Sequence, residues 1–166
     1  MNIHSSENKQ PTANSQQPEL KYCYKYPHPA VTADCVIFGF DESNNMKVLL
    51  IQRGNDPYKG KWAFPGGFME IDETAEQCAR RELEEETGLK DVAVEQFYTF
   101  TDVKRDPRER VITVAHYALV KLSEVKGGDD ADDAQWFSLD KLPPLAFDHE
   151  EILNKALQTL KERKKL

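Results

Sequence analysis

The feature that most constrains this chain is the stretch over residues 74–87, whose helical pattern places acidic side chains on its apolar face. Thr74 and Gln77 fit a capping box, and Gly88 follows where a glycine commonly ends a helix. At about 100° per residue, small and apolar residues gather on one side, which we expect to be buried: Ala75, Cys78, Ala79 and Leu83. Three acidic residues lie on this same side: Glu82, Glu85 and Glu86.

Three inward carboxylates would repel one another and lose hydration, so their position indicates a cation placed against them. Mg²⁺ takes oxygen ligands, is usually held by one or two carboxylates, and keeps positions open for substrate phosphates. Arg81 lies one turn before Glu85 and can hold that carboxylate in place. The competing interpretation is a solvated salt-bridge face, which is common for charge runs, although the phase of this helix opposes it. The helix by itself leaves both interpretations open.

The surrounding sequence resembles the signature of a known enzyme family. Residues 67–89 read GFMEIDETAEQCARRELEEETGL, which is similar to the Nudix box: Gly, five residues, Glu, seven residues, then Arg-Glu-apolar-x-Glu-Glu-x-Gly-apolar. Every defined position agrees: Gly67, Glu73, Arg81, Glu82, Leu83, Glu85, Glu86, Gly88 and Leu89. The likeness continues into KWAFPGG before the box and LAFDHEEIL after it, and so covers most of positions 30–160.

This resemblance implies a fold and a set of roles. The fold would be the Nudix fold of the α+β class, a mixed β-sheet sandwiched between the box helix and the C-terminal helix. The metal ligands would be Glu82, Glu85, Glu86 and the backbone carbonyl of Gly67, holding Mg²⁺ or Mn²⁺. Arg81 would orient the catalytic glutamates, and Glu73 would be a supporting carboxylate. A general base could be Glu82, or a carboxylate outside the box, for which the candidates are Glu109, Asp130, Asp132 and Asp133.

The pattern of elements agrees with an α+β arrangement. Strands are expected at 30–40, 46–53, 62–64, 91–101, 110–121 and 136–137, with an acidic loop over 127–133. A last helix should begin near Asp148, whose pairing with Glu151 suggests a second capping box. Strands and helices do not alternate regularly, which argues against a doubly wound sheet. We expect residues 1–20 to form a disordered tail and residues 21–166 to form a single domain.

Composition excludes several classes of partner. The net charge of −7 argues against a nucleic-acid backbone as the main ligand, since Lys and Arg provide that binding. No apolar run approaches the roughly 20 residues needed to cross a bilayer. The three cysteines form no CxxC pair, which favours thiols in a reducing, cytoplasmic protein. His116 and His149 show no metal-ligand spacing and are expected to be structural.

Features outside the box suggest a substrate. The stretch KRDPRER, residues 104–110, resembles a DPR-containing segment of ADP-ribose pyrophosphatases and of Nudix regulators of NAD metabolism, and WF followed by LPPLAFDH resembles the same subgroup. The resemblance implies hydrolysis of ADP-ribose to AMP and ribose 5-phosphate, by a protein that is commonly a homodimer in this subgroup. Guanidinium groups match phosphate oxygens, so the candidate substrate contacts are Arg53, Arg105, Arg108 and Arg110.

Two alternatives remain at this point. One is a MutT-like hydrolase of oxidised nucleoside triphosphates, which the box alone does not distinguish from an ADP-ribose enzyme. The other is a non-catalytic ADP-ribose sensor that controls transcription. Such regulators carry a winged-helix domain after the Nudix fold and usually a degraded box. Here the box is intact and the chain ends at Leu166, so we expect an enzyme.

Overall fold

The computed structural model describes residues 24–123, 125 and 131–165, with the side chains of 131 and 132 excepted. Its strands are β1 Ala30–Phe40, β2 Met46–Arg53, β3 Trp62–Ala63, β4 Gly66–Phe68, β5 Glu95–Phe100, β6 Val111–Lys121 and β7 Ala131–Ser138. Its helices are α1 Ala75–Thr87 and α2 His149–Glu162. The tail expected over residues 1–20 lies outside the described residues.

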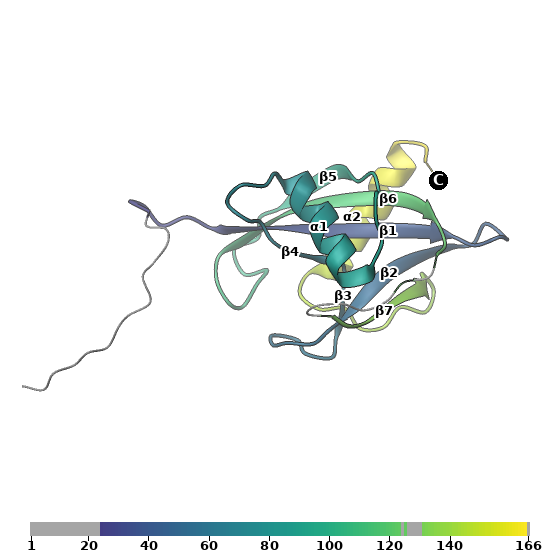
Figure 1. Ribbon diagram of the computed structural model, residues 1–166, viewed down its shortest axis with the longest axis horizontal. Helices are drawn as coiled ribbons and strands as arrows, with labels where there is room; N and C mark the ends of the chain where they lie inside the picture. Colours follow the sequence, from purple (N-terminus) through teal and green to yellow (C-terminus); the bar gives the residue numbers. More distant parts are fainter. Residues whose placement is uncertain (1–23, 124, 126–130, 166) are drawn as a thin grey trace, which may run out of the picture.

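The strands form one mixed sheet with the order β3-β2-β1-β6-β5, to which β4 adds beside β1 and β7 beside β2 (Figure 1). β1 and β6 are parallel along their whole length, from the pair Ala30 and Val111 to the pair Phe40 and Lys121. The other neighbours are antiparallel. Because the two long parallel strands are buried at the centre, their sequences are nearly continuous in apolar residues.

β1 and β2 pair over only part of their length, and this divergence shapes the molecule. Their register runs over three residue pairs at one end, from Phe38 with Val48 to Phe40 with Met46. Farther along, β4 pairs with residues 32–34 of β1, and β3 pairs with residues 51 and 52 of β2. The segment that contains β3 and β4 therefore lies between the two diverging strands, and it carries Gly67, the first glycine of the box.

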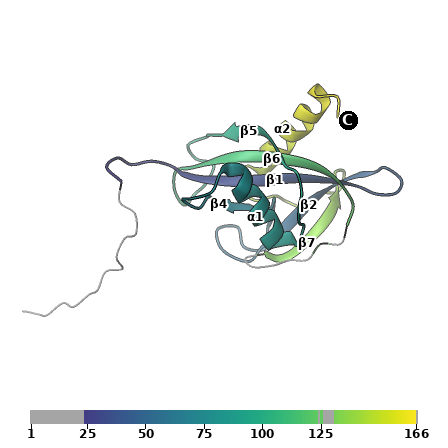
Figure 2. The ribbon, with the colours of Figure 1, turned by 45° about the horizontal axis from the view of Figure 1, so that its top comes forward.

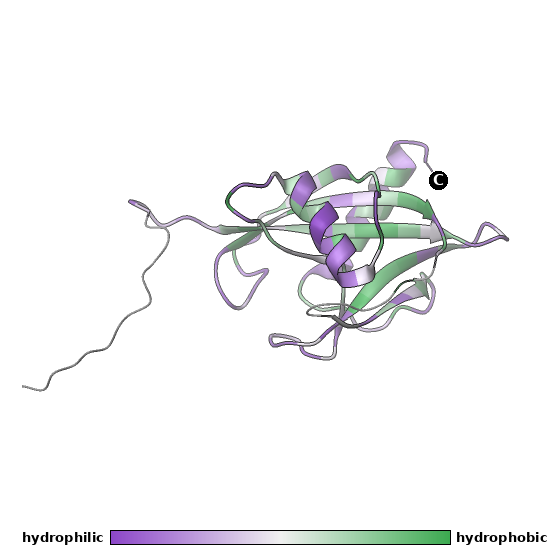
Figure 3. Ribbon diagram, in the orientation of Figure 1, coloured by the Kyte–Doolittle hydropathy of each residue, from purple (hydrophilic) through white to green (hydrophobic). Residues whose placement is uncertain are grey.

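Helices cover both faces of the sheet, as Figures 1 and 2 show with α1 on one face and α2 on the other. Successive residues of β1 point to opposite faces, so the strand contributes to two cores. Ala33, Cys35 and Ile37 pack with residues of α1, whereas Val36 and Phe38 pack with residues of α2. In Figure 3 the central strands are largely hydrophobic, whereas α1 is mostly hydrophilic. The expected α+β sandwich is confirmed.

Several local expectations can be compared with the structure. Thr74 and Gln77 form the capping box, and Gly88 ends α1 in the left-handed conformation with a φ of 74°. The second capping box was wrong, because the Asp148 side chain makes no cap hydrogen bond to α2. It binds Arg105 instead. The acidic loop was expected over residues 127–133, but residues 131–133 belong to β7, which begins at Ala131 and pairs with β2.

Two further observations concern composition. Cys35 and Cys78 are free thiols buried in the core that α1 covers, and Cys23 lies outside the described residues. Among the described residues, no helix is long and apolar enough to cross a membrane.

Candidate active site

A cavity of about 420 Å³ opens beside the segment that contains β3 and β4. Its acidic wall is formed by α1 and the loop before it, with Glu70, Glu82, Glu85 and Glu86. The other lining residues come from β1, from β2 and the loop after it, from the segment that contains β3 and β4, from the loop after β5, and from the start of α2 and the residue Phe147 before it. Thus segments distant in the sequence meet at one place because β1 and β2 diverge there.

Gly67 brings the backbone of β4 against the acidic wall. A Cβ atom on this residue would lie 2.4 Å from Oε1 of Glu82, so only glycine permits this approach. The Gly67 carbonyl accepts a hydrogen bond from the Cys78 thiol, whose Sγ lies 3.6 Å away. The backbone oxygen proposed as a ligand is therefore held next to the carboxylates of α1.

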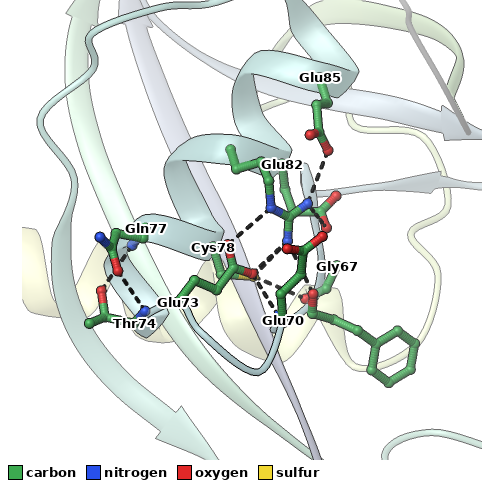
Figure 4. A network of polar contacts seen from close by, with 10 residues as sticks. Gly67, Glu70, Glu73, Thr74, Gln77, Cys78, Glu82 and Glu85 are labelled. Carbon is green, nitrogen blue, oxygen red and sulfur yellow. Dashed lines mark hydrogen bonds and ion pairs between the residues drawn. The ribbon is translucent and has the colours of Figure 1, made fainter. Parts of the chain in front are cut away.

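Arg81 joins three of the box carboxylates. Its Nη1 donates to Glu82 at 2.8 Å and to Glu85 at 3.0 Å. Its Nε and Nη2 donate to the two carboxylate oxygens of Glu73 at 3.0 and 2.6 Å. Figure 4 shows Glu73, Glu82 and Glu85 turned toward this shared centre. The hydrogen bonds from Arg81 lower the pKa of Glu73 to about 2, so Glu73 remains an anion that fixes the guanidinium.

Glu86 is the most buried of the acidic residues on the wall. Its Oε2 accepts a hydrogen bond from the backbone N–H of Gly66 at 2.9 Å. Burial, together with the negative charges of Glu82 and Asp34, raises its pKa to about 8. Burial also raises the pKa of Glu82. Without a cation, the wall therefore disfavours full ionisation of its own carboxyl groups.

The donor set fits a hard divalent cation. It consists of carboxylate oxygens and a backbone carbonyl, which are the ligands that Mg²⁺ and Mn²⁺ prefer. In the described part of the chain, however, no three His, Cys, Asp or Glu side chains are already arranged around an ion position. Glu82 and Glu85 are turned to Arg81, and Glu86 to the Gly66 N–H. Ion binding thus requires a change of partner by side chains that already lie together.

Of the four predicted substrate arginines, Arg53, Arg105 and Arg108 line the cavity and Arg110 does not. The surroundings of the three differ. Arg105 is buried and binds both carboxylate oxygens of Asp148, at 2.8 and 2.7 Å. Its guanidinium is therefore already engaged in a structural ion pair. Arg108 also binds both carboxylate oxygens of its neighbour Asp106, at 3.0 and 2.7 Å. It lies over the rings of Phe68 and Phe147, at 5.1 and 5.6 Å from their centroids. Arg53 lies 4.9 Å from the Phe147 centroid.

Glu109 and Asp133, the two general-base candidates outside the box whose side chains the structure describes, are not brought to the acidic wall. Glu109 is exposed, and neither Glu109 nor Asp133 lines the cavity. Asp130 and the side chain of Asp132 lie outside the described residues. Among the candidates whose side chains the structure describes, Glu82 alone lines the cavity.

Sequence reasoning missed Asp34, a buried residue in the middle of β1 that lines the cavity. Its Oδ2 accepts a hydrogen bond from the Thr113 hydroxyl at 2.6 Å, and it lies 3.8 Å from Nη2 of Arg105. A signal was available, because an aspartate within the apolar run AVTADCVIFGF is unusual in a buried strand. The cavity also contains His149, which we expected to be only structural.

His149 begins α2 and is buried against aromatic rings. Its Nδ1 accepts a hydrogen bond from the backbone N–H of Phe64 at 2.9 Å. Its ring stacks on that of Phe64 with a centroid distance of 5.1 Å and an angle of 8°. Burial lowers its pKa, so the ring is neutral near pH 7. This hydrogen bond is consistent with the structural role expected for His149. The same ring also lines the cavity.

Known proteins resemble this chain over most of its length. Residues 28–158 match the family model described as NUDIX domain. An ADP-ribose pyrophosphatase of Methanocaldococcus jannaschii is 45% identical over 135 residues, which cover 81% of this chain and 77% of the relative. An ADPR responsive transcriptional repressor, NtrR, of Acinetobacter baylyi is 36% identical over 143 residues, which cover 83% of this chain and 57% of the repressor.

A solved structure shows the same likeness in three dimensions. The NUDIX domain of Shewanella oneidensis NrtR, crystallised with ADP ribose, superimposes with a TM-score of 0.77 at 34% identity. The match covers 84% of this chain and 94% of that domain. The fold thus agrees with that of a domain crystallised with ADP ribose.

Proposed function

The chain belongs to the Nudix family, and from this premise we propose that it is an Mg²⁺-dependent pyrophosphohydrolase that cleaves ADP-ribose to AMP and ribose 5-phosphate. The observation that carries the proposal is the acidic wall of the cavity. Glu82, Glu85 and Glu86 converge there beside the Gly67 carbonyl. The archaeal pyrophosphatase with 45% identity supports the choice of substrate.

Hydrolysis of a diphosphate requires charge neutralisation and a positioned nucleophile. A bound Mg²⁺ or Mn²⁺ would supply positive charge against the phosphates and the acidity that activates water. Glu82 lies in the cavity and can accept the proton that an attacking water loses. We therefore assign the role of general base to Glu82.

Arg81 and Glu73 act by position. Arg81 holds Glu82 and Glu85 at one wall, and the charge of Glu73 keeps the guanidinium from turning away. Arg81 is thus the residue that sets where the two carboxylates stand before substrate enters. Glu73 reaches the reaction only through Arg81, so it is a positioning residue.

The side of the cavity that carries arginines would receive the rest of the nucleotide. Arg53 and Arg108 lie over the Phe147 ring, so that cationic and aromatic surfaces meet at one place. Guanidinium groups bind phosphate oxygens, and aromatic rings accept a sugar or a base. Arg105 would support this wall through Asp148 rather than by reaching freely into the cavity.

The acidic wall would be costly to keep in a sensor that only binds. The similarity to the NtrR repressor favours a sensor as the second candidate function. Carboxylates at all metal-binding positions of the box favour catalysis, because the burial of Glu86 and Glu82 disfavours their ionisation and needs a compensating cation.

The deciding experiment measures release of AMP from ADP-ribose with and without Mg²⁺ or Mn²⁺, beside other nucleoside diphosphate derivatives and oxidised nucleoside triphosphates. We expect metal-dependent release that Glu85→Gln and Glu86→Gln each strongly reduce. Binding of ADP-ribose without release in either metal would support the sensor. A preference for ADP-ribose below about tenfold over the other compounds would overturn the substrate while leaving the reaction class intact.

We also propose a cytoplasmic homodimer whose partner in catalysis is a small molecule rather than a nucleic acid. The free thiols of Cys35 and Cys78 support a reducing compartment. The dimer rests on analogy with related ADP-ribose enzymes. Light scattering coupled to size-exclusion chromatography tests the dimer, and a monomer at micromolar concentration would overturn it.

A further inference from the structure

Besides the carboxylates of α1, the cavity contains a pair of polar side chains that come from other elements. The pair consists of His149 and Asp34, both more than nine-tenths buried and both lining the cavity. Nε2 of His149 and Oδ1 of Asp34 are 4.0 Å apart. This is too long for a direct hydrogen bond and short enough for a single atom to contact both.

The hydrogen bond from Phe64 fixes the tautomer of His149. A backbone N–H can only donate, so Nδ1 must be the acceptor and carries no proton. In the neutral ring the proton is then on Nε2, which becomes a donor. Among the residues that the structure describes, no atom accepts a hydrogen bond from this donor. In that part of the chain, every fully buried polar side-chain atom has a hydrogen-bond partner. Nε2 has none, so it is not fully buried and is open to the cavity that His149 lines.

Asp34 offers a hydrogen-bond acceptor, whereas Nε2 of His149 is a donor. Its Oδ2 is occupied by the Thr113 hydroxyl at 2.6 Å, and its charge is balanced by Arg105, whose Nη2 lies 3.8 Å away. Oδ1 is the oxygen that faces His149. A group placed between them therefore meets a hydrogen-bond donor on one side and a charged acceptor on the other.

We propose that His149 and Asp34 form a hydroxyl-binding site that recognises a ribose hydroxyl of the nucleotide substrate. A hydroxyl can accept from Nε2 and donate to Oδ1 at the same time. A phosphate oxygen cannot donate and would be repelled by Asp34, whereas an ammonium group cannot accept from His149. The pair therefore selects a neutral group that both donates and accepts.

The position of the pair indicates the sugar next to the diphosphate. Gly66 lies between the acidic wall and the pair of His149 and Asp34. Its N–H donates to Glu86, and a Cβ on it would be 2.7 Å from Oδ1 of Asp34. A ribose esterified to a phosphate carries the hydroxyls nearest to that phosphate. The identification of the sugar rests on the proposed function, but the hydroxyl site itself does not. Either the adenosine ribose or the terminal ribose could supply the hydroxyl, and the two sources are separable by experiment.

The test measures binding by calorimetry without metal, so that hydrolysis plays no part. One series of probes is AMP with its 2′-deoxy and 3′-deoxy forms, and the other is ribose 5-phosphate with its 2-deoxy and 3-deoxy forms. In one series we expect loss of one hydroxyl to weaken binding about tenfold. The series that shows this preference identifies the source. A preference below about twofold in both series would overturn the proposal, with only water between the two residues.

Two substitutions of one residue separate its two roles. In His149→Asn, the amide oxygen can replace Nδ1 as the acceptor for Phe64, but no group reaches the position of Nε2. In His149→Gln, the amide nitrogen reaches that position while the acceptor for Phe64 is lost. We expect Asn, which loses the stacking on Phe64 but keeps the acceptor, to lower the melting temperature less than Gln and to reduce the hydroxyl preference to below about threefold. We expect Gln to lower the melting temperature and keep most of the preference.

Further outcomes are equally decisive. An unchanged preference in His149→Asn would overturn the proposal. Should that variant fail to fold, a loss of preference in a folded His149→Gln would overturn it, and retention would support it. In the wild type, the ¹⁵N and ¹H signals of the His149 imidazole should report a proton on Nε2 and should shift with the hydroxylated probe more than with its deoxy form. Release of AMP from ADP-ribose is measured separately, so hydroxyl preference without hydrolysis would overturn only the proposed function.

Discussion

Both carboxylate oxygens of Glu73 accept hydrogen bonds from Arg81, at 3.0 and 2.6 Å, while the same guanidinium reaches Glu82 and Glu85 from its other end. One arginine thus connects a supporting carboxylate before the helix with two carboxylates on it. The pKa of Glu73 is lowered to about 2, so its charge is present at every pH at which the protein would work. The geometry of the acidic wall depends on this connection.

Glu73→Gln should therefore reduce activity without removing any metal ligand. A neutral amide holds the guanidinium less firmly, so Glu82 and Glu85 lose their fixed positions. We expect kcat to fall by about 10- to 100-fold with little change in KM. Glu76→Gln is the matched control, since Glu76 is exposed on the same helix and its contact with Arg80 is at 4.0 Å. Equal effects of the two substitutions in steady-state assays would contradict the positioning role.

Glu86→Gln should separate activity from stability. Its pKa in the folded protein is about 8, above the ordinary value of 4.5. Between these two pH values the folded protein therefore holds a proton that the unfolded chain has lost. In the metal-free protein this contribution to stability is fully present below pH 4.5 and is lost as the pH rises through 8. Glutamine stays neutral and can keep the hydrogen bond from Gly66. The difference in melting temperature, variant minus wild type, should therefore increase as the pH is raised from 5 to 8.

The same variant should lose about 10²–10³-fold in Mg²⁺-supported activity, because a buried ligand has been removed. Its melting temperature should also respond less to added Mg²⁺ than that of the wild type. Glu84→Gln provides the control, since Glu84 is on the exposed side of α1 and pairs with Lys90 at 2.8 Å. A full response to Mg²⁺ in Glu86→Gln would argue against Glu86 as a ligand.

Gly67→Ala should impair catalysis more than folding. The added methyl group would lie 2.4 Å from Oε1 of Glu82, which is the end of a flexible side chain and can move away. That movement displaces the proposed general base and crowds the backbone carbonyl beside it. We expect kcat to fall by roughly 10²-fold and thermal unfolding to change little. A variant with near wild-type kcat would show that the close approach of Gly67 and Glu82 has no part in the reaction.

Asp148→Asn should destabilise the whole domain. Arg105 is buried and donates two hydrogen bonds to Asp148, so the substitution leaves a buried guanidinium with an incomplete counter-charge. Removing one partner of such a pair costs about 3 kcal/mol of unfolding free energy. Denaturant unfolding measures this cost, with Glu84→Gln in the exposed pair with Lys90 as the comparison. If the two substitutions had equal effects, the Arg105–Asp148 pair would not contribute as a buried pair.

The helix that carries the box could be predicted closely because its signals are local. The capping box at Thr74 and the glycine that ends the helix act within a few residues, and the phase of the glutamates follows from helical geometry. The second capping box failed for the opposite reason. Asp148 has a stronger partner in Arg105, which is 43 residues away and brought near only by the folded chain.

The sequence alone determined the chemistry of one wall: which carboxylates share a helical face, and which arginine stands one turn from them. These relations repeat every few residues and need no distant partner. Which residues line the rest of the cavity was decided only by the tertiary structure. Asp34, Phe64 and His149 meet because β1 and β2 diverge and a later helix begins at the opening. No local pattern specifies such a meeting, since it depends on long-range strand pairing and on burial that only the complete fold provides.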